Sequence, residues 1–398
     1  MTEVILDISR LISRVRYSTP SGVDRVEMAY ARGLLNHYGE ALTFAAVHPS
    51  GLYGRLSRRA ALAYLDELER RWSLEEGSPR QRSLVSVIPQ LAALLPSRGA
   101  ALLSGTVYVQ VSPHHLTNAA KVRRILMREK ARFLCLVHDL IPIEFPEYAR
   151  PSGAALHRRR IGTVAKLADG IIVNSAATGR SLEPWLEKAR QGSVRKPRIH
   201  VALLGTEQLP PVAPEPGDGR PYFVCLGTIE PRKNHLLLLH LWRHLAETLP
   251  PQEVPRLFLI GRRGWENEQV IDMLERCPAL RGHVEELGGC PDARLSGLLR
   301  GARALLMPSF SEGYGMPVAE ALSVGTPAVC SNLPALREVG GSVPDYLDPL
   351  DGAGWKAAIL DHARGGPSHV AQMSRLPKWH NPTWEEHMAI VRDAIEGL

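Results

Sequence analysis

Two glutamates eight positions apart, set around a glycine-containing loop, have the types and spacing to do chemistry. The segment 308–327 reads P-S-F-S-E-G-Y-G-M-P-V-A-E-A-L-S-V-G-T-P, with Glu312 in the loop and Glu320 about one turn inside the helix expected to follow. Pro317 fits the start of that helix, where no N–H donor is needed. Free N–H groups and the helix dipole there suit a diphosphate. Either Glu320 accepts hydrogen bonds from ribose hydroxyls and Glu312 from a sugar, or both are ordinary acids near a helix N-terminus.

A second candidate phosphate site follows the strand expected at 222–226. The next residues read G-T-I-E-P-R-K-N and begin with Gly227 and Thr228. Turns at the carboxyl ends of parallel strands are where open α/β sheets bind ligands. Arg232 with its planar fork and Lys233 with its point charge could neutralise a diphosphate leaving group. A solvated pair of basic residues is the alternative interpretation.

Short apolar or β-branched runs alternate with longer helical patterns along the chain. This alternation is typical of parallel sheets built from βα units, and it predicts an α/β protein with two doubly wound, Rossmann-like domains. The expected strands are 4–8, 43–47, 107–111, 133–137, 171–173 and 200–203 in the first half, and 222–226, 256–260, 283–287, 304–307 and 328–330 in the second.

A Pro/Gly-rich stretch at 209–220 divides the chain near its middle. Because it can continue neither a helix nor a central strand, it predicts an interdomain linker. We therefore expect one domain over 1–208 and another over 221–379. The segment 51–105 is less regular and predicts a helical insertion with apolar positions Leu52, Leu56, Leu62, Leu65 and Leu68.

The basic residues are concentrated in the first half. Residues 1–210 contain 30 Lys+Arg and 18 Asp+Glu, a balance of +12, whereas residues 211–398 contain 18 and 23, a balance of −5. The basic clusters form either a solvated face or a surface for an anionic membrane or a phosphate-bearing acceptor. They lack interleaved aromatic residues, so no nucleic-acid partner is expected. The clusters are Arg55, Arg58 and Arg59; Arg123, Arg124, Arg128, Lys130 and Arg132; and Arg158, Arg159 and Arg160.

The cysteines and apolar runs predict the cellular setting. Five scattered cysteines form no C-x-x-C pair, so neither a disulfide framework nor a zinc site is predicted, and a reducing cytoplasm fits. The segment 1–9 carries Glu3 and Asp7 where a signal peptide would be basic and then apolar, and it predicts a first strand. The apolar runs are far shorter than the roughly 20 residues of a membrane span. We expect a cytoplasmic protein.

The motifs of the second half, taken in order, resemble the donor-binding domain of the family 4 retaining glycosyltransferases. G-T-I-E-P-R-K-N, I-G-R-R-G-W, G-G-C-P-D-A-R-L and P-S-F-S-E-G-Y-G-M-P-V-A-E-A-L follow one another with the spacing of that family. The resemblance covers nearly the whole chain and is looser in the first half. It implies the GT-B fold, with an acceptor-binding domain, a donor-binding domain and a C-terminal helix, 380–398, that returns to the first domain through Trp384.

By this resemblance, Glu312 and Glu320 are the two acids of the family's E-x7-E motif. Lys233 matches its phosphate-binding lysine, and Arg232 supplies part of the same charge. Backbone amides on the two loops would bind the donor sugar and its phosphates. These donor-binding positions are Gly227, Thr228, Gly313, Tyr314, Gly315 and Met316.

Two loops of the first half carry further positions. P-S-G-V-D-R at 20–25 resembles the family's glycine loop over the donor diphosphate and gives Gly22 a backbone role. H-D-L-I-P-I-E-F-P-E resembles its histidine-containing active-site loop, which makes His138 a candidate contact for the donor sugar. A structural histidine is the alternative for His138. Asp139 could simply cap the following turn.

The resemblance implies a retaining, metal-independent hexosyltransferase of surface polysaccharide synthesis, with GDP-mannose as the first choice of donor. The acceptor would be a glycan or a polyprenyl-linked glycan. No metal ion and no pyridoxal phosphate are expected, because protein cations and helix dipoles can stabilise the departing diphosphate. A phosphorylase, a nucleotide-sugar epimerase and a non-catalytic binding subunit are the alternatives. The basic first half also predicts peripheral contact with an anionic inner membrane leaflet, aided by Leu52, Tyr53 and Leu56 unless the 51–105 insertion packs into the core.

Overall fold

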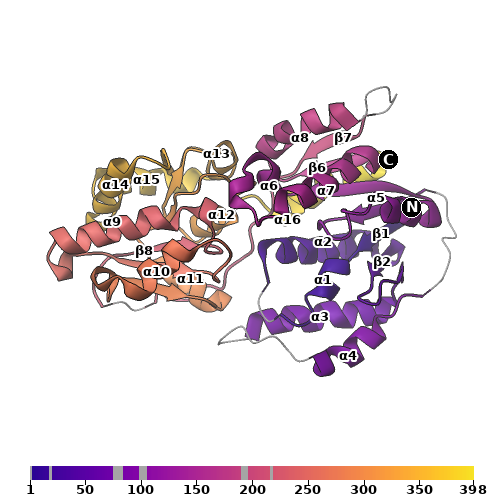
Figure 1. Ribbon diagram of the computed structural model, residues 1–398, viewed down its shortest axis with the longest axis horizontal. Coiled ribbons are helices and arrows are strands. Elements are labelled where there is room, and N and C mark those ends of the chain that lie inside the picture. Colours follow the sequence, from indigo (N-terminus) through magenta and orange to yellow (C-terminus); the bar gives the residue numbers. More distant parts are fainter. Residues whose placement is uncertain (1, 18–19, 75–83, 98–104, 190–195, 216–217) are drawn as a thin grey trace. The chain divides into compact units, whose positions relative to one another are not determined.

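The computed structural model describes residues 2–17, 20–74, 84–97, 105–189, 196–215 and 218–398. These residues form two compact units, labelled by element in Figure 1. The chain passes from the first unit to the second between Gly205 and Thr206 and returns between Pro382 and Thr383. The first unit thus contains both ends of the described chain, and the second is the continuous stretch 206–382 apart from its short gap.

A seven-stranded sheet forms the centre of the first unit, in the order β3-β2-β1-β4-β5-β6-β7. All of its neighbours pair in parallel except β2 and β3, which are antiparallel. Every residue of β1, β4 and β6 is buried, as expected of central strands covered on both faces. The strands are β1 (Val4–Asp7), β2 (Leu42–Val47), β3 (Tyr53–Arg55), β4 (Thr106–Gln110), β5 (Ala131–Val137), β6 (Gly170–Val173) and β7 (Arg198–Val201).

Helices connect and cover these strands. The helices of the first unit are α1 (Ser9–Ser13), α2 (Gly22–Tyr38), α3 (Arg58–Leu74), α4 (Leu84–Ala93), α5 (Ala119–Glu129), α6 (Ile141–Glu144), α7 (Gly153–Leu167), α8 (Ala176–Ala189) and α16 (Trp384–Glu396), with 3-10 turns η1 (Gly39–Ala41) and η2 (Pro146–Tyr148).

Helix α2 begins at a capping box. The Ser21 hydroxyl accepts a hydrogen bond from the Asp24 amide at 3.4 Å, and the Asp24 carboxylate accepts one from the Ser21 amide at 2.7 Å. Two otherwise unpaired donors of the first turn are satisfied in this way. Arg10 of α1 reaches the same carboxylate at 2.6 Å, so the loop after β1 is tied to the start of α2.

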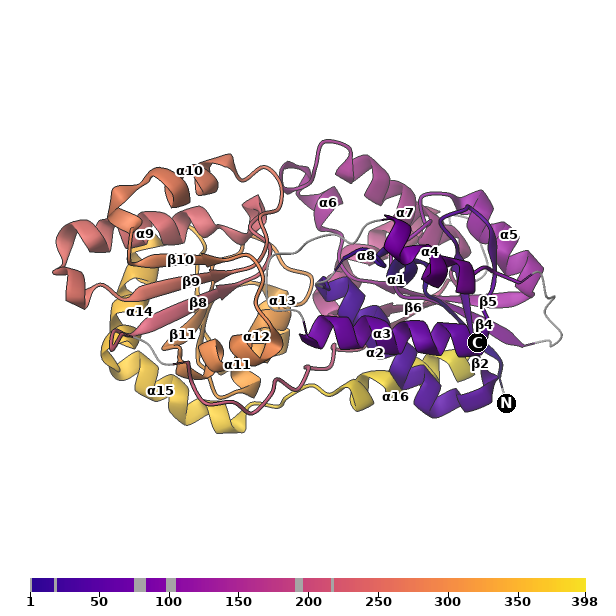
Figure 2. The same ribbon diagram turned by 90° about the horizontal axis from the view of Figure 1, so that it is seen from below.

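The second unit contains a six-stranded parallel sheet in the order β10-β9-β8-β11-β12-β13. Figure 2 shows β10, β9, β8 and β11 lying side by side in this order. Its strands are β8 (Tyr222–Leu226), β9 (Arg256–Ile260), β10 (Val284–Leu287), β11 (Ala304–Met307), β12 (Ala328–Ser331) and β13 (Asp345–Leu347). Its helices are α9 (His235–Thr248), α10 (Glu268–Arg276), α11 (Asp292–Gly301), α12 (Met316–Ser323), α13 (Pro334–Gly340), α14 (Gly352–Arg364) and α15 (Pro367–Arg375), with 3-10 turns η3 (Pro231–Lys233), η4 (Pro251–Glu253), η5 (Pro278–Leu280) and η6 (Leu376–Lys378).

The C-terminal helix α16 packs in the first unit, where it lies in yellow among the indigo and purple elements (Figures 1 and 2). It begins at a capping box between Thr383 and Glu386. Its buried His387 bonds the carbonyl of Leu203 at 3.0 Å and the hydroxyl of Tyr30 at 2.8 Å. These two contacts join the end of the chain to the region after β7 and to α2.

The α/β class with two Rossmann-like units is confirmed, and the strands differ from the expected ranges by at most two residues at either end. The short edge strands β3 and β13 were not predicted, because three residues are too few to show a period. The helical interpretation of Leu52 and Leu56 is wrong. The hairpin of β2 and β3 lies there, with Leu56 buried and Leu52 exposed.

The expected linker is packed rather than extended in its described part. The carbonyl of Pro210 accepts a hydrogen bond from Ser296 at 2.6 Å, and the amide of Glu215 donates to the carbonyl of Gly297 at 3.1 Å. Both partners belong to α11, so residues 206–215 lie against the second unit. Across the described ranges, no helix combines the length and apolar character needed to cross a bilayer.

Candidate functional site

Two loops of the second unit meet at the carboxyl edge of its sheet. One follows β8 and ends in η3, and the other follows β11 and ends at α12. Strands β8 and β11 are parallel neighbours at the point where the strand order reverses direction. Open α/β sheets bind ligands at such a topological switch point. The topology therefore brings together the two segments that the sequence singles out.

Glu312 lies at the centre of this meeting point. Lys233 Nζ donates to its Oε1 at 2.7 Å, and Arg232 Nη1 lies 2.7 Å from its Oε2. The Ser309 hydroxyl donates to Oε1 at 2.7 Å. Only 6% of the Glu312 side chain is exposed, so this carboxylate is buried against two cations of the neighbouring loop.

Arg232 joins the two loops along their backbones as well. Its Nη1 donates to the carbonyl of Ser311 at 2.9 Å, and its own carbonyl accepts from the Phe310 amide at 2.8 Å. Its Nε lies 2.6 Å from the carboxylate of Glu230, which is also buried. Two cations and two carboxylates therefore form one compact cluster whose formal charges cancel.

The protonation states follow from this pairing. Burial by itself raises the pKa of Glu312, but the charges of Arg232 and Lys233 and their hydrogen bonds more than offset it, and the pKa falls to about 2. Glu230 behaves in the opposite way, because burial and the nearby Glu312 raise its pKa despite Arg232. Glu312 is thus an anion at neutral pH.

Glycines let three loops approach one another closely. Gly227, directly after β8, has φ +141°, and Gly261, directly after β9, has φ +153°. A Cβ on Gly261 would lie 2.0 Å from the Gly227 carbonyl oxygen, so a side chain there would push the two loops apart. Gly315 has φ +112°, and a Cβ on it would lie 2.4 Å from Leu336. The backbone at these turns therefore requires glycine.

The remaining predicted donor positions lie on the same loops. Gly313 and the buried Tyr314 follow Glu312 in the loop, and Met316 is the first residue of α12. Glu320 lies in the second turn of that helix and is half-buried. Thr228 follows Gly227 and lies close to Gly264, since a Cβ on Gly264 would be 2.7 Å from the Thr228 methyl carbon. Whether these residues bind a donor stays a prediction.

The two candidates of the first half lie in the first unit. Gly22 is exposed and is the first residue of α2. His138 directly follows β5, and its Nε2 lies 2.8 Å from the carbonyl oxygen of Val111. A carbonyl only accepts, so Nε2 carries the proton; burial lowers the pKa of His138, which leaves Nδ1 as an acceptor for a hydroxyl group. Asp139 accepts from the Ile141 amide at 3.1 Å, the turn-capping role that was its alternative.

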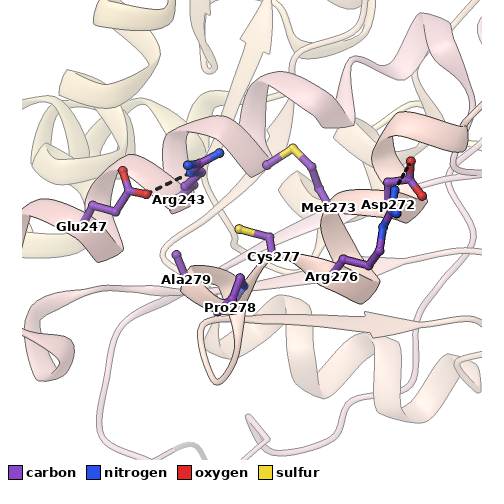
Figure 3. A pocket seen from close by; sticks show the side chains of 8 residues that line it. All are labelled: Arg243, Glu247, Asp272, Met273, Arg276, Cys277, Pro278 and Ala279. Atoms are coloured by element: carbon purple, nitrogen blue, oxygen red, sulfur yellow. Dashed lines mark hydrogen bonds and ion pairs between the residues drawn. The ribbon is translucent and has the colours of Figure 1, made fainter.

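A cavity of about 520 Å³ lies elsewhere in the second unit (Figure 3). It lies near the last turns of α9 and α10, whereas the Glu312 cluster adjoins the beginning of α9. Its wall holds two ion pairs, Arg243 with Glu247 at 2.9 Å and Arg276 with Asp272 at 2.6 Å. None of the predicted site residues lines this cavity.

The structure thus brings together Arg232, Lys233 and Glu312, which lie about 80 positions apart in the sequence. Glu230 and Ser309 were not predicted from the sequence as part of this cluster. Both residues belong to the motifs quoted above. The spacing of Glu230, two residues before Arg232, could have predicted an ion pair between them. The pairing of Glu312 with both cations was not foreseen, because each group had been assigned to a ligand instead.

Comparison with known proteins places both loops within a stretch that a glycosyltransferase family model matches. The model of the family described as "Glycosyl transferases group 1" matches residues 211–342, which contain both loops. The match is confined to the second unit.

Several curated relatives of the chain are named mannosyltransferases. It is 40% identical over 141 residues to O-antigen chain mannosyltransferase B of Escherichia coli, covering 35% of this chain and 36% of that protein. It is 27% identical over 232 residues to the serotype-specific mannosyltransferase WbdA of Escherichia coli, covering 54% and 28%. A phosphatidyl-myo-inositol mannosyltransferase of Mycolicibacterium smegmatis is 32% identical over 191 residues, 46% of each chain. The alignments thus span less than half of each relative's length.

Solved structures show the same fold over the whole chain. A sucrose-phosphate synthase from Thermosynechococcus elongatus aligns with a TM-score of 0.65 at 14% identity, covering 100% of this chain and 99% of that one. HepE of Anabaena, solved with UDP and glucose, aligns with a TM-score of 0.62 at 14% identity over 100% of both chains. The architecture is therefore the GT-B fold, and the resemblance noted in the sequence is confirmed.

Proposed function

We propose that this chain is a retaining glycosyltransferase that moves a hexose from a nucleotide sugar to a glycan or a lipid-linked glycan. The observation that carries the proposal is the cluster of Arg232, Lys233 and Glu312, which lies at the switch point of the second sheet and inside the stretch that the group 1 family model matches. Both cations lie close to the turn at Gly227, whose backbone conformation requires glycine. Such an arrangement suits a diphosphate leaving group and the sugar attached to it.

In this reaction the protein must stabilise the negative charge that develops on the diphosphate as its bond to the sugar breaks. Lys233 and Arg232 hold two positive charges within 2.7 Å of one carboxylate, so each can turn to phosphate oxygens once a donor arrives. The start of α12 adds the positive end of its helix dipole, whereas Pro317 has no N–H and the Val318 amide already bonds the Gly315 carbonyl at 2.9 Å. Glu312, released from the cations, then faces the sugar hydroxyls.

The names of several relatives indicate mannose as the transferred sugar. Escherichia coli O-antigen chain mannosyltransferase B, WbdA and the mycobacterial enzyme are all named mannosyltransferases. We therefore propose GDP-mannose as the donor and a growing surface polysaccharide as the setting. Because the two cations can meet the leaving-group charge, the proposed reaction needs no metal ion, and we propose no part in it for pyridoxal phosphate.

We further propose that the first unit contacts an anionic membrane, through a surface other than the 51–105 segment. In that segment Arg55 is paired with Glu3 and Glu129 and Arg58 bonds backbone carbonyls, which leaves Arg59 as the exposed cation of its cluster. Helices α5 and α7 instead lie side by side and carry exposed cations with no ion pair to a described acid. This α5/α7 surface comprises Arg123, Arg124, Lys130, Arg158, Arg159 and Lys166, with Met127 73% exposed among them.

The experiment incubates the purified chain with GDP-, UDP-, dTDP- and ADP-sugars and a polyprenyl-linked glycan in excess EDTA. The expected result is transfer of mannose from GDP-mannose, with the α-configuration of the donor kept in the product by NMR. Activity that disappears in EDTA and returns with magnesium or manganese would refute metal independence. Absence of transfer from every donor would refute the proposed function.

A further inference from the structure

Arg160 of α7 is a half-buried arginine that has no counter-ion among the described residues. Its Nε is shielded from solvent and bonded to nothing, and its guanidinium makes no hydrogen bond or ion pair within the described ranges. The neighbouring Arg158 and Arg159 are exposed to solvent and need no partner. A guanidinium that loses water without gaining an anion carries an unfavourable desolvation cost.

The charged groups that act on Arg160 make its position more unfavourable. Burial, together with the positive charge of Arg10, lowers the pKa of the Arg160 guanidinium. Arg10 lies in α1, directly after β1, and the same Arg10 charge acts on His138 at the end of β5. The three side chains therefore share the region at the carboxyl ends of β1 and β5, on either side of β4.

This region is the switch point of the first sheet. Strand β1 pairs with β2 on one side and with β4 on the other, so connections leave it in both directions. It is the location in the first unit that corresponds to the β8/β11 edge of the second. Ligand binding at this edge is therefore expected from topology as well as from charge.

None of the described acids of this region, Asp139 included, forms an ion pair with Arg160. Arg10 and Arg14 both pair with Asp24, at 2.6 and 3.2 Å, so one carboxylate serves two guanidinium groups. Burial and the nearby Asp7 raise the pKa of Glu27 to about 8, which leaves that side chain mostly uncharged at neutral pH. Asp7 is itself engaged by the Ser9 amide at 3.0 Å and the Tyr108 hydroxyl at 2.6 Å.

We propose that Arg160 and Arg10 form a phosphate-binding site in the first unit, and that the bound phosphate belongs to a phosphorylated sugar whose hydroxyl group meets His138. The proposal rests on the proposed function for the identity of the ligand. The guanidinium forks match phosphate oxygens, and the His138 Nδ1 lone pair accepts from a hydroxyl. Two sources offer this chemistry: the diphosphate of the donor and the phosphate of a lipid-linked acceptor.

The test measures binding of inorganic pyrophosphate by calorimetry in a Lys233→Met background, which removes the principal cation of the second unit. Arg160→Gln on that background is expected to weaken the remaining binding about 10- to 100-fold, the range for hydrogen bonds to charged groups. Arg159→Gln is the matched control, one residue away on the same helix but exposed. It should change the dissociation constant less than about twofold.

Thermal unfolding separates this role from a structural one. If Arg160 serves to bind an anion, Arg160→Gln should leave the Tm of the ligand-free protein unchanged or raise it. It should also abolish the increase in Tm that pyrophosphate causes in the Lys233→Met protein. A fall in Tm without ligand would show that the guanidinium stabilises the fold. Equal pyrophosphate affinity in Arg160→Gln and Arg159→Gln would overturn the site.

Steady-state kinetics distinguish the two sources of phosphate. A KM increase confined to the acceptor on Arg160→Gln assigns the site to the acceptor's phosphate, whereas an increase confined to the donor assigns it to the donor diphosphate. An effect on kcat alone, with both KM values and pyrophosphate binding unchanged, would contradict a binding role. The pyrophosphate titration measures binding without turnover. A failure to bind pyrophosphate would therefore leave the proposed function standing, and a failure of sugar transfer would leave the proposed site standing.

Discussion

At the scale of single residues, the charge state of the site depends on Glu312. In the free protein this carboxylate neutralises Lys233 and Arg232, which are the cations that a diphosphate needs. A donor must therefore compete with Glu312 for them. The same competition explains how one residue can restrain nucleotide binding and still assist the transfer of the sugar.

Glu312→Gln is expected to tighten binding of free GDP about tenfold while depressing turnover. The cluster then has a net charge of +1 instead of zero, and the amide still accepts from Ser309 and Lys233. Glu320→Gln, the second acid of the motif, should instead weaken GDP binding, since its carboxylate is assigned to the ribose. Calorimetry with GDP measures both, and unchanged or weaker binding in Glu312→Gln would contradict the competition.

At the scale of elements, α16 is held by close backbone contact and by one buried histidine. A Cβ on Gly205 would lie 2.2 Å from the Trp384 amide nitrogen, so this glycine is required for the helix to pack where it does. The ring of His387 packs edge-on against Tyr30 and Trp384, each at 5.2 Å between centroids. Sequence patterns indicate that the last helix is amphipathic, but they cannot show such a contact.

Gly205→Ala should destabilise the protein by about 3 kcal/mol or more, because the added methyl group overlaps backbone that has no room to move. Gly162→Ala is the matched control. Gly162 lies within α7 with open space around its Cα, so the substitution should stabilise by about 0.5–1 kcal/mol. Urea unfolding measures both; equal stability of the two variants would show that α16 does not pack tightly on Gly205.

His387 should make the first unit sensitive to acid. Burial lowers its pKa to about 4, although bonds to Leu203 and Ala202 act the other way. The unfolded chain, with a histidine pKa near 6.5, binds the proton first, so stability is full above about pH 6.5 and is lost as pH falls toward 4. The loss amounts to roughly 3 kcal/mol.

The variant His387→Phe isolates this contribution. It should be less stable than wild type at pH 7.5, since it loses two hydrogen bonds, but its free energy of unfolding should fall less steeply between pH 6.5 and 4.5. Urea titrations at several pH values provide the slopes. Identical slopes for the two proteins would mean that His387 does not titrate on unfolding.

At the scale of the whole molecule, the class of fold could be predicted from the sequence, but the pairing of charges at the sites could not. Buried runs such as 222–226 and 304–307 predicted strands correctly, because central parallel strands are apolar throughout. The pairing of Glu312 with Arg232 and Lys233, and the lack of a counter-ion for Arg160 among the described residues, depend on contacts between distant segments. No local pattern encodes them.

The α5/α7 surface makes a whole-molecule prediction about membranes. Wild type should sediment with vesicles containing anionic lipid but not with zwitterionic vesicles, and high salt should release it. The quadruple variant Arg123→Gln, Arg124→Gln, Arg158→Gln, Arg159→Gln should bind on the order of 1,000-fold more weakly, because each of the four cations contributes about 1 kcal/mol.

The control for this surface removes cations elsewhere. Arg281 and Lys378 are exposed in the second unit and form no ion pair with a described acid, so Arg281→Gln, Lys378→Gln should bind vesicles like wild type. Equal loss in the control, or equal binding to both kinds of vesicle, would show that the α5/α7 surface is merely solvated. Vesicle binding is measured without donor or acceptor and so does not depend on the proposed reaction.

The central claim is that the Lys233–Arg232–Glu312 cluster binds and stabilises the leaving diphosphate, and kcat/KM for the nucleotide sugar tests it most directly. Lys233→Met should lower kcat/KM at least about 100-fold, the usual cost of removing one group that stabilises charge in a transition state. Arg262→Met is the matched control, exposed on the neighbouring loop after β9, and should stay within about twofold of wild type. A loss of less than tenfold in Lys233→Met, or equal losses in both variants, would contradict the account.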